Sequence, residues 1–193
     1  AKRLGAVVEA TDLRPTAKEQ VESLGGKWLD VPMSPEEQAR ADEAAKNGYG
    51  WTPGEQYIKD QAAIVDKAVS NADIVITTAL LPGRNAPRLI KAETVAKMKP
   101  GSVILDMAVE TGGNVEGSKV GETVFTENGV KILGVPNIPS TLSTEASALY
   151  ARNVFNFVET LFDADKNFSI NPEEEIQKAL LVTHGGQVLL KRG

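Results

Sequence analysis

The chain opens with the end of a helix, a glycine and an apolar strand that leads to an acid, within the run AKRLGAVVEATD. The expected strand covers Ala6, Val7 and Val8, and Asp12 follows at its carboxyl end. In a dinucleotide-binding βαβ unit, such an acid lies about 20 residues after the first glycine of G-x-G-x-x-G and binds ribose hydroxyls. Counting back from Asp12 places that glycine loop before residue 1. We therefore expect a fragment of a longer dinucleotide-binding protein.

Beyond this opening, strands and helices alternate along the chain. The expected helices are KEQVESLG, 56–70 and 91–98, and the expected strands are 27–31, 72–78, 102–108 and 130–135. These strands are apolar runs, which is typical of parallel strands covered on both faces. The pattern predicts an α/β fold with a Rossmann-type, doubly wound parallel sheet, truncated at its N-terminus so that the first strand and glycine-rich loop are missing.

Three segments depart from this alternation. Residues 32–55 are rich in charge, alanine, glycine and proline and are longer than an ordinary βα loop, so we interpret them as a mobile excursion. Residues 141–162 predict a long amphipathic helix, and the tail predicts a hairpin that turns at Gly185-Gly186. We expect residues 1–162 to form the nucleotide-binding domain and residues 163–193 to belong to a second, mostly absent domain.

Composition excludes several classes of protein. The 193 residues carry a net charge of -5 without a cluster of Lys and Arg, so we expect no nucleic acid and no anionic lipid surface as a partner. The chain has no cysteine, which excludes disulfides, thiolate metal sites and a cysteine nucleophile. No apolar run approaches the roughly 20 residues that span a bilayer, so we expect no direct membrane insertion by this segment.

Asp12 predicts the choice of nucleotide. A carboxylate that binds the 2′ and 3′ hydroxyls repels a 2′-phosphate, so it favours NAD over NADP. The alternative is an acid that caps the following turn, where Asp is common. Arg14 keeps an NADP site open, and it is equally consistent with a guanidinium that stacks on adenine.

Other strand ends carry small, polar or glycine-rich sequence at the edge where α/β sheets bind ligands. At Thr78, Ala79 and Leu80 the backbone can approach a flat cofactor ring, although a strand followed by a turn explains these residues equally well. Glu110 lies beside the pair Gly112-Gly113. It is either a buried carboxylate that relays a proton or binds ribose, or a residue that stabilises a turn.

Two further polar residues have less defined roles. Asn137 lies between prolines, where its amide either reaches a nicotinamide ribose or carboxamide or serves an ordinary turn. His184 is the only histidine and lies in the tail, so a structural or surface role is favoured. With one histidine and no cysteine, a His-rich zinc site cannot be assembled.

Several co-linear motifs together resemble a known family. They are AKRLGAVVEATDLRP…KEQVESLGGKW, NGYG, DIVITTALLPGRNAPRLI, MKPGSVILDMAVETGGN and GVKILGVPNIPS. From residue 1 to about Phe162, the chain resembles the NAD(H)-binding domain, domain I, of the proton-translocating nicotinamide nucleotide transhydrogenase alpha subunit. Alanine dehydrogenase shares the architecture. Two features favour transhydrogenase: Gly48-Tyr49, similar to that family's mobile loop, and Glu110-Thr111, where alanine dehydrogenases typically show Asp-Gln.

The resemblance implies hydride transfer from NADH to NADP+, coupled in the intact enzyme to proton movement through a membrane domain. It implies that Asp12 holds the adenosine ribose, that Leu80 lines the cleft and that Tyr49 closes over the nucleotide, with Glu110 and Asn137 at the nicotinamide end. Direct transfer between two nicotinamides needs no acid or base, so we expect no catalytic residue and no metal ligand. The expected NAD(H)-binding residues are Asp12, Leu13, Arg14, Gly48, Tyr49, Thr78, Ala79, Leu80, Glu110 and Asn137.

The resemblance also implies partners and a location. The partners are the NADP(H)-binding domain and the membrane domain of the same enzyme, with a homodimer of this subunit, at the cytoplasmic face of the inner membrane. Because that family's glycine loop and nicotinamide loop lie upstream of Ala1, we expect the fragment alone to bind NADH poorly and to be inactive. Two alternatives stay open: an NAD-dependent alanine dehydrogenase-like oxidoreductase, and a catalytically silent nucleotide-binding module.

Overall fold

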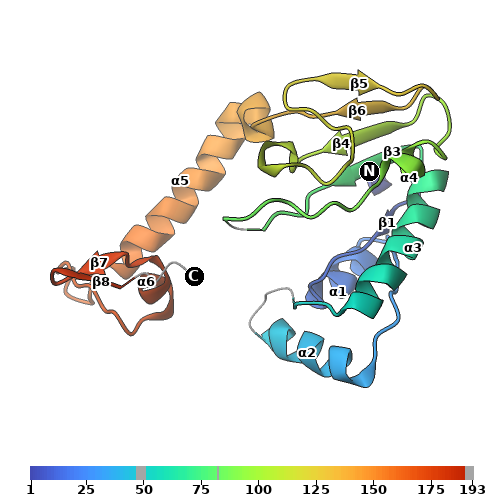
Figure 1. Ribbon diagram of the computed structural model, residues 1–193. Coiled ribbons are helices and arrows are strands. Elements are labelled where there is room, and N and C mark those ends of the chain that lie inside the picture. Colours follow the sequence, from blue (N-terminus) through green and yellow to red (C-terminus); the bar gives the residue numbers. More distant parts are fainter. Residues whose placement is uncertain (47–50, 82, 190–193) are drawn as a thin grey trace. The chain divides into compact units, whose positions relative to one another are not determined.

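The chain folds into helices and strands that alternate along most of its length (Figure 1). The computed structural model describes residues 1–46, 51–81 and 83–189. They belong to two compact units, Ala1–Pro136 and Asn137–Gly193. The sequence suggested a boundary after Phe162 instead, and the assignment of residues 1–162 to one nucleotide-binding domain stays a prediction.

The first unit contains most of the strands. Its elements, with η for a 3-10 helix, are η1 (Lys2–Leu4), β1 (Glu9–Ala10), α1 (Thr16–Ser23), β2 (Lys27–Trp28), α2 (Pro35–Lys46), α3 (Glu55–Asn71), β3 (Ile74–Thr77), α4 (Ala92–Val95), β4 (Val103–Asp106), η2 (Val109–Thr111), β5 (Thr123–Phe125) and β6 (Lys131–Leu133). The helices and strands expected from the sequence are present, although most strands are shorter than predicted.

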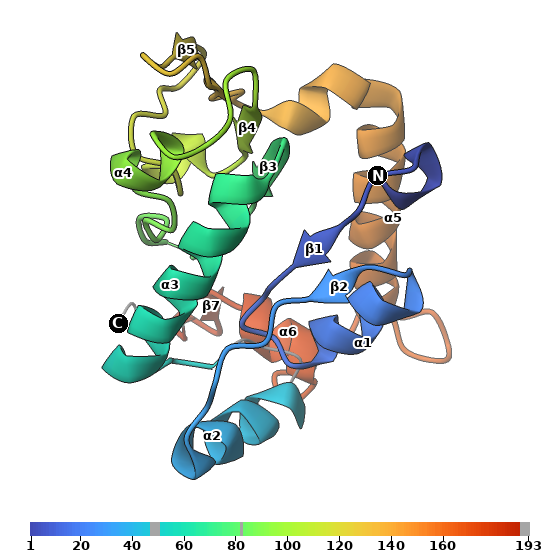
Figure 2. The same cartoon turned by 90° about the vertical axis from the view of Figure 1, so that its right-hand side faces the viewer.

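Two sheets organise this unit. One contains four strands in the order β3-β4-β6-β5, and the other pairs β1 with β2. All neighbouring strands are parallel except β5, which is antiparallel to β6. Figure 2 shows β1 and β2 side by side, with α1 next to them. The predicted α/β fold with a mainly parallel sheet is therefore confirmed.

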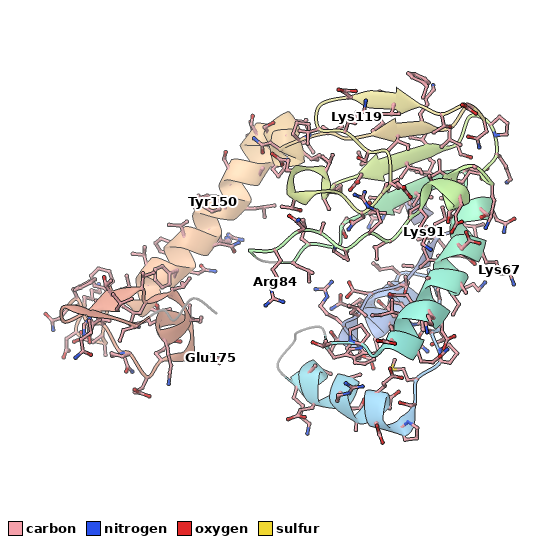
Figure 3. All side chains as sticks on the ribbon, viewed as in Figure 1. Lys67, Arg84, Lys91, Lys119, Tyr150 and Glu175 are labelled. Carbon is pink, nitrogen blue, oxygen red and sulfur yellow. The ribbon has the colours of Figure 1, made fainter. Side chains whose placement is uncertain are left out.

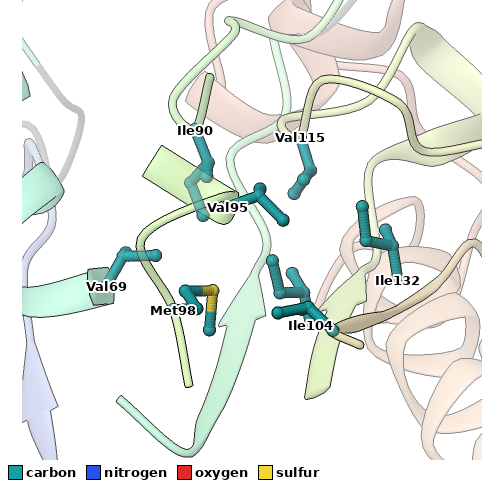
Figure 4. Close-up of a cluster of buried hydrophobic side chains, with 8 residues drawn as sticks. Val69, Ile90, Val95, Met98, Ile104, Val115 and Ile132 are labelled. Carbon is teal, nitrogen blue, oxygen red and sulfur yellow. The ribbon is translucent and has the colours of Figure 1, made fainter. Parts of the chain in front are cut away.

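One face of the four-stranded sheet forms the main core (Figure 4). Side chains alternate between the two faces of a strand, so Ile104 of β4 and its partner Ile132 of β6 point into the same core. The buried cluster consists of Val69, Ile90, Val95, Met98, Ile104, Val115, Val130 and Ile132. Ile90 and Val115 come from the segments that follow β3 and β4. The core therefore anchors these loops as well as the strands.

The connection over residues 32–55 contains helix α2. Ser34 and Glu37 form a capping box at its start: the N–H of Glu37 donates to Ser34 Oγ at 3.2 Å, and the N–H of Ser34 donates to Glu37 Oε2 at 3.1 Å. Pro35 is the first helical residue, where its missing N–H has no intrahelical partner to lose. The interpretation as a mobile excursion is therefore wrong for residues 35–46.

A second buried cluster fixes this helix. It consists of Val31, Ala41, Trp51 and Tyr57, with Leu13 packed against it. The rings of Trp51 and Tyr57 meet edge to face, with centroids 4.8 Å apart. Ala41 is fully buried, so α2 has an apolar side that is held against this cluster. Gly48 and Tyr49, predicted to close over a nucleotide, lie outside the described residues.

The first strand also differs from its prediction. It forms at Glu9–Ala10 instead of residues 6–8, because its partners in β2 are Lys27 and Trp28. Val7 is 89% exposed. The predicted glycine stop is present, since η1 ends at Gly5 in the left-handed region with φ of 85°. The antiparallel strand β5 was not predicted, and it follows from a tight turn in which Gly129 N–H donates to the carbonyl of Thr126.

The second unit contains the remaining elements. They are η3 (Ile138–Leu142), α5 (Ser143–Thr160), α6 (Glu175–Leu180), β7 (Thr183–His184) and β8 (Gln187–Val188). The predicted hairpin is confirmed, because Gly185 and Gly186 both adopt positive φ values of 57° and 78° between β7 and β8. The predicted long helix is confirmed as α5, but none of its residues is buried among the described parts of the chain. Leu149, for example, is 68% exposed.

Candidate functional site

Asp12 lies just beyond the carboxyl end of β1 and is held by Arg14. The backbone N–H of Arg14 donates to Asp12 Oδ1 at 2.8 Å, Nε donates to Oδ1 at 3.1 Å, and Nη2 donates to Oδ2 at 2.8 Å. Partial burial raises the pKa of the Asp12 carboxyl, but the hydrogen bonds and charge of Arg14 outweigh it and hold that pKa below its usual range. Asp12 is therefore an anion at neutral pH.

A shallow pocket of about 280 Å³ opens beside this ion pair. It is lined by Ala10, Thr11, Asp12, Arg14, Ala17, Gln20, Val21, Leu24 and Trp28. The Thr11 hydroxyl is buried and has no hydrogen-bond partner among the described residues. Leu13 turns the other way and packs against the second buried cluster. The β1–α1 junction thus combines an apolar wall, an anion and an unused hydroxyl, a combination suited to a ribose and a flat base.

The loops after β3 and β4 meet through one buried side chain, Asn114. Its Oδ1 accepts from the N–H of Ala79 at 3.0 Å, and its Nδ2 donates to the carbonyls of Ala79 at 3.0 Å and Pro87 at 2.8 Å. Ala79 therefore lies against the loop that carries Glu110. The neighbouring residues Thr78 and Leu80 are exposed. Three of the predicted residues thus sit on a backbone segment with a fixed neighbour.

Asp106 supports the same crossing from the end of β4. Its carboxylate is fully buried and accepts from the backbone N–H groups of Ala108 at 3.0 Å, Asn114 at 3.2 Å and Val115 at 3.1 Å. The hydroxyl of Thr77 lies 3.4 Å away on β3. A ring of backbone donors satisfies this buried charge without a neighbouring cation. The carboxylate therefore shapes the loop between residues 106 and 115.

Glu110 borders a second pocket, of about 470 Å³. Its other lining residues are Gly83, Arg84, Asn85 and Thr111. Figure 3 shows Arg84 projecting from the loop that follows β3. Glu110 itself lies in η2 and is exposed, so the expectation of a buried carboxylate at this position is wrong. Its loop is a 3-10 turn on the surface, and the buried acid of the segment is Asp106.

Asn137 is the first residue of the second unit. It adopts a left-handed conformation with φ of 45° and begins η3. Its carbonyl accepts from the N–H of Ser140 at 2.9 Å and from the Ser140 hydroxyl at 2.8 Å. A left-handed Asn is typical of a turn, which is the alternative that the sequence left open.

Asp106 and Asn114 were not predicted as site residues. Their signal was present in DMAVETGGN, where an acid at a strand end precedes a glycine pair and an amide. Gly113 has φ of 77°, and a Cβ added there would lie 2.6 Å from Asp106 Oδ2. Only glycine fits so close to the carboxylate. The glycine pair therefore marks close packing against Asp106 as well as the surface of a ligand site.

Comparison with known proteins identifies the family. Residues 1–191 match the family model for the alanine dehydrogenase/PNT C-terminal domain. The chain belongs to the alanine dehydrogenase/PNT family. The resemblance predicted from the motifs is thus confirmed, and it covers nearly the whole chain.

The relatives within this family favour transhydrogenase. An NAD(P) transhydrogenase subunit alpha of Rhodospirillum rubrum is 47% identical over 190 residues, which cover 98% of this chain and 48% of that protein. NAD(P) transhydrogenase subunit alpha of Haemophilus influenzae is 40% identical over 97% of this chain and 36% of that protein. Alanine dehydrogenase 1 of Staphylococcus aureus is 28% identical over 66% of this chain and 35% of that protein. The chain thus spans about half or less of the length of these relatives.

Solved structures give the same order. A transhydrogenase from Sinorhizobium meliloti matches with a TM-score of 0.72 and 43% identity, over 97% of this chain and 46% of that one. An L-alanine dehydrogenase matches with a TM-score of 0.51 and 27% identity, over 79% of this chain and 42% of that one. Among the described residues, every helix is too short or too polar to cross a bilayer.

Proposed function

We propose that this member of the alanine dehydrogenase/PNT family binds NAD(H) and takes part in hydride transfer between NADH and NADP+. The support is the gap in similarity between its two groups of relatives. Identity is 47% across 98% of the chain with a transhydrogenase alpha subunit, and 28% across 66% with an alanine dehydrogenase. The observation in the structure that carries the proposal is the anionic Asp12 beside the pocket at the end of β1.

Asp12 would hold the adenosine ribose. The contacts described above occupy two acceptor positions on Oδ1 and one on Oδ2. A carboxylate offers about four such positions, so Oδ2 keeps capacity for a ribose hydroxyl. Its negative charge would also repel the 2′-phosphate of NADP. Leu13 supports the turn from the side of the second cluster, and Arg14 fixes the carboxylate.

The rest of the nucleotide would lie along the other predicted residues. Thr78, Ala79 and Leu80 would offer backbone and apolar surface, and Glu110 would border the nicotinamide end; Asn137, Gly48 and Tyr49 stay predictions of the family resemblance. Bound NADH supplies the hydride. The chain's own role is to orient the nucleotide and to exclude water, which requires no acid or base.

The proposal includes partners and a location. The NADP(H)-binding domain and the membrane domain of the same enzyme would receive the hydride and couple it to proton translocation. The subunit would form a homodimer and lie at the cytoplasmic face of the inner membrane.

The test compares two acids that each pair with a neighbouring cation. In the full-length protein, Asp12→Asn should weaken NADH binding by about 1 to 3 kcal/mol, the range for a lost hydrogen bond to a charged group. Asp30→Asn is the matched control, because exposed Asp30 pairs with Lys18 at 2.7 Å and does not line the pocket. Calorimetric titration with NADH and NADPH measures both effects. Equal affinity in the Asp12 variant and the control would remove Asp12 as the ribose ligand.

The reaction is tested separately on the full-length protein. We expect NADH-dependent reduction of an NADP+ analogue and no turnover with pyruvate and ammonia. Turnover with pyruvate and ammonia would identify an alanine dehydrogenase instead. NADH binding without either reaction would identify a silent nucleotide-binding module.

A further inference from the structure

Asn114 lies where three chain segments meet, and it is fully buried. Its side chain bonds to Ala79 and Pro87, as described above. Its own carbonyl accepts from the N–H groups of Leu89 at 2.9 Å and Ile90 at 3.0 Å. Its own N–H donates to Asp106 at 3.2 Å. One residue therefore joins the end of β4 to both halves of the loop after β3.

The contact with Ala79 requires an amide of this length. Asn114 accepts from the N–H and donates to the carbonyl of the same residue, as a neighbouring strand would. Aspartate offers no donor and leucine offers neither group, while glutamine is longer by one methylene. At a site that water does not reach, each unmade bond leaves a desolvated backbone group. The side chain thus extends the pairing of β3 and β4 beyond the last ladder residues, Thr77 and Asp106.

The loop after β3 is fastened to the loop after β4 at further points. The N–H of Ala86 donates to the carbonyl of Thr111 at 2.8 Å. Arg88 donates to the carbonyls of Gly112 and Val115. These bonds lie farther along the loop, so among the described contacts Asn114 is the one that holds Ala79 itself. Asn114 therefore controls the segment nearest the strand end.

We propose that Asn114 is a positioning residue for the nucleotide site. It holds the backbone of Ala79, and with it the exposed Thr78 and Leu80, in place before the nucleotide binds. This inference rests on the proposed NAD(H) site. Without the clamp, the segment has to be ordered during binding, and that ordering entropy subtracts from the affinity.

The test uses two asparagines with similar bonding at opposite ends of the sheet. Asn128 donates from Nδ2 to the carbonyls of Val95, Ala96 and Met98 and accepts from the Thr126 hydroxyl. It precedes β6 and is therefore at the amino end of the strands. In the full-length protein, we expect Asn114→Ala to weaken NADH binding about tenfold and Asn128→Ala less than about twofold. Both variants should lower the thermal midpoint, so a purely structural role predicts equal effects on affinity.

A pH profile of a second variant separates positioning from general loosening. In Asn114→Asp, the carboxylate cannot donate to the carbonyl of Ala79, but the protonated acid can. Its NADH affinity relative to the unchanged protein should therefore improve as the pH falls, while Asn114→Ala shows no such recovery. A flat profile with weak binding would contradict the donor role of Asn114.

A measurement on the unchanged protein covers the case in which the variants do not fold. On titration with NADH, the side-chain amide signal of Asn114 and the backbone amide signal of Ala79 should shift together in NMR spectra, while the side-chain signal of Asn128 stays in place. If NADH binds and only the signals of Asn114 and Ala79 are unaffected, the positioning role is overturned and the proposed function stands. If NADH does not bind the unchanged protein, the proposed function fails as well.

Discussion

The buried carboxylate of Asp106 should stabilise the loop after β4 more than any exposed acid of this segment does. It accepts three backbone hydrogen bonds, two on Oδ1 from Ala108 and Asn114 and one on Oδ2 from Val115. In Asp106→Asn, one of the two oxygens becomes an amide donor. The better orientation keeps the two bonds on the remaining oxygen and places the new NH2 group against the N–H of Val115.

The expected loss follows from these contacts. A buried N–H without a partner costs about 1 to 3 kcal/mol, and the two remaining bonds each lose roughly 1 kcal/mol of charge assistance. The lower cost of burying a neutral amide offsets some of this sum. We therefore expect Asp106→Asn to lower the free energy of unfolding by about 2 to 3 kcal/mol.

Urea unfolding of the full-length protein, followed by tryptophan fluorescence, measures this loss. Glu116→Gln is the matched control, because Glu116 is exposed and its carboxylate accepts one backbone bond, from Ala92 at 2.8 Å. The control should cost less than about 1 kcal/mol. Hydrogen exchange at the amide of Val115 should also accelerate in the Asp106 variant alone. Equal unfolding midpoints for the two variants would refute the assignment of the loop's stability to the buried carboxylate.

Two further predictions concern the neighbouring glycine and the ion pair at β1. Gly113→Ala should destabilise the protein by about 1 to 3 kcal/mol in the same urea assay, because φ is 77° and the new Cβ would lie 2.6 Å from Asp106 Oδ2; Gly121→Ala, with φ of 75° and open space, isolates the backbone share, and equal losses would exclude the contact with Asp106. Arg14→Ala should raise the pKa of the Asp12 carboxyl in an NMR titration, because Arg14 holds it below its usual range. Since the folded-state pKa is depressed, the pair's stabilisation is complete above the unfolded value of about 3.9 and disappears as the pH falls through the folded value. An unchanged Asp12 titration would show that Arg14 does not bind the carboxylate in solution.

Much of the fold could be predicted because its signals are local. The apolar runs around Val75, Ile104 and Ile132 became parallel strands, and the pair Gly185-Gly186 became a hairpin turn. The capping box at Ser34 was also local, and it was overlooked because the segment around it is polar. A helix start of this kind depends on four consecutive residues, so the sequence contains all the information that it needs.

The candidate site was only partly predictable, for a physical reason. Strand ends collect at one edge of a parallel sheet, so the pattern alone could nominate Asp12, Thr78 to Leu80 and Glu110. Which acid is buried depends on contacts across the fold: Glu110 is exposed in η2, whereas Asp106 is enclosed by backbone donors. No property of a single segment distinguishes these two carboxylates.

The sequence by itself determined the family, the alternation of strands and helices, and the acid at the end of the first strand, since each depends on neighbouring residues or on co-linear motifs. The tertiary structure alone decided that β5 runs antiparallel to β6 and that the amide of Asn114 closes on Ala79. Asn114 and Ala79 are 35 residues apart in the chain. A hydrogen bond of this kind forms only after the sheet has brought both strand ends together and removed water from between them.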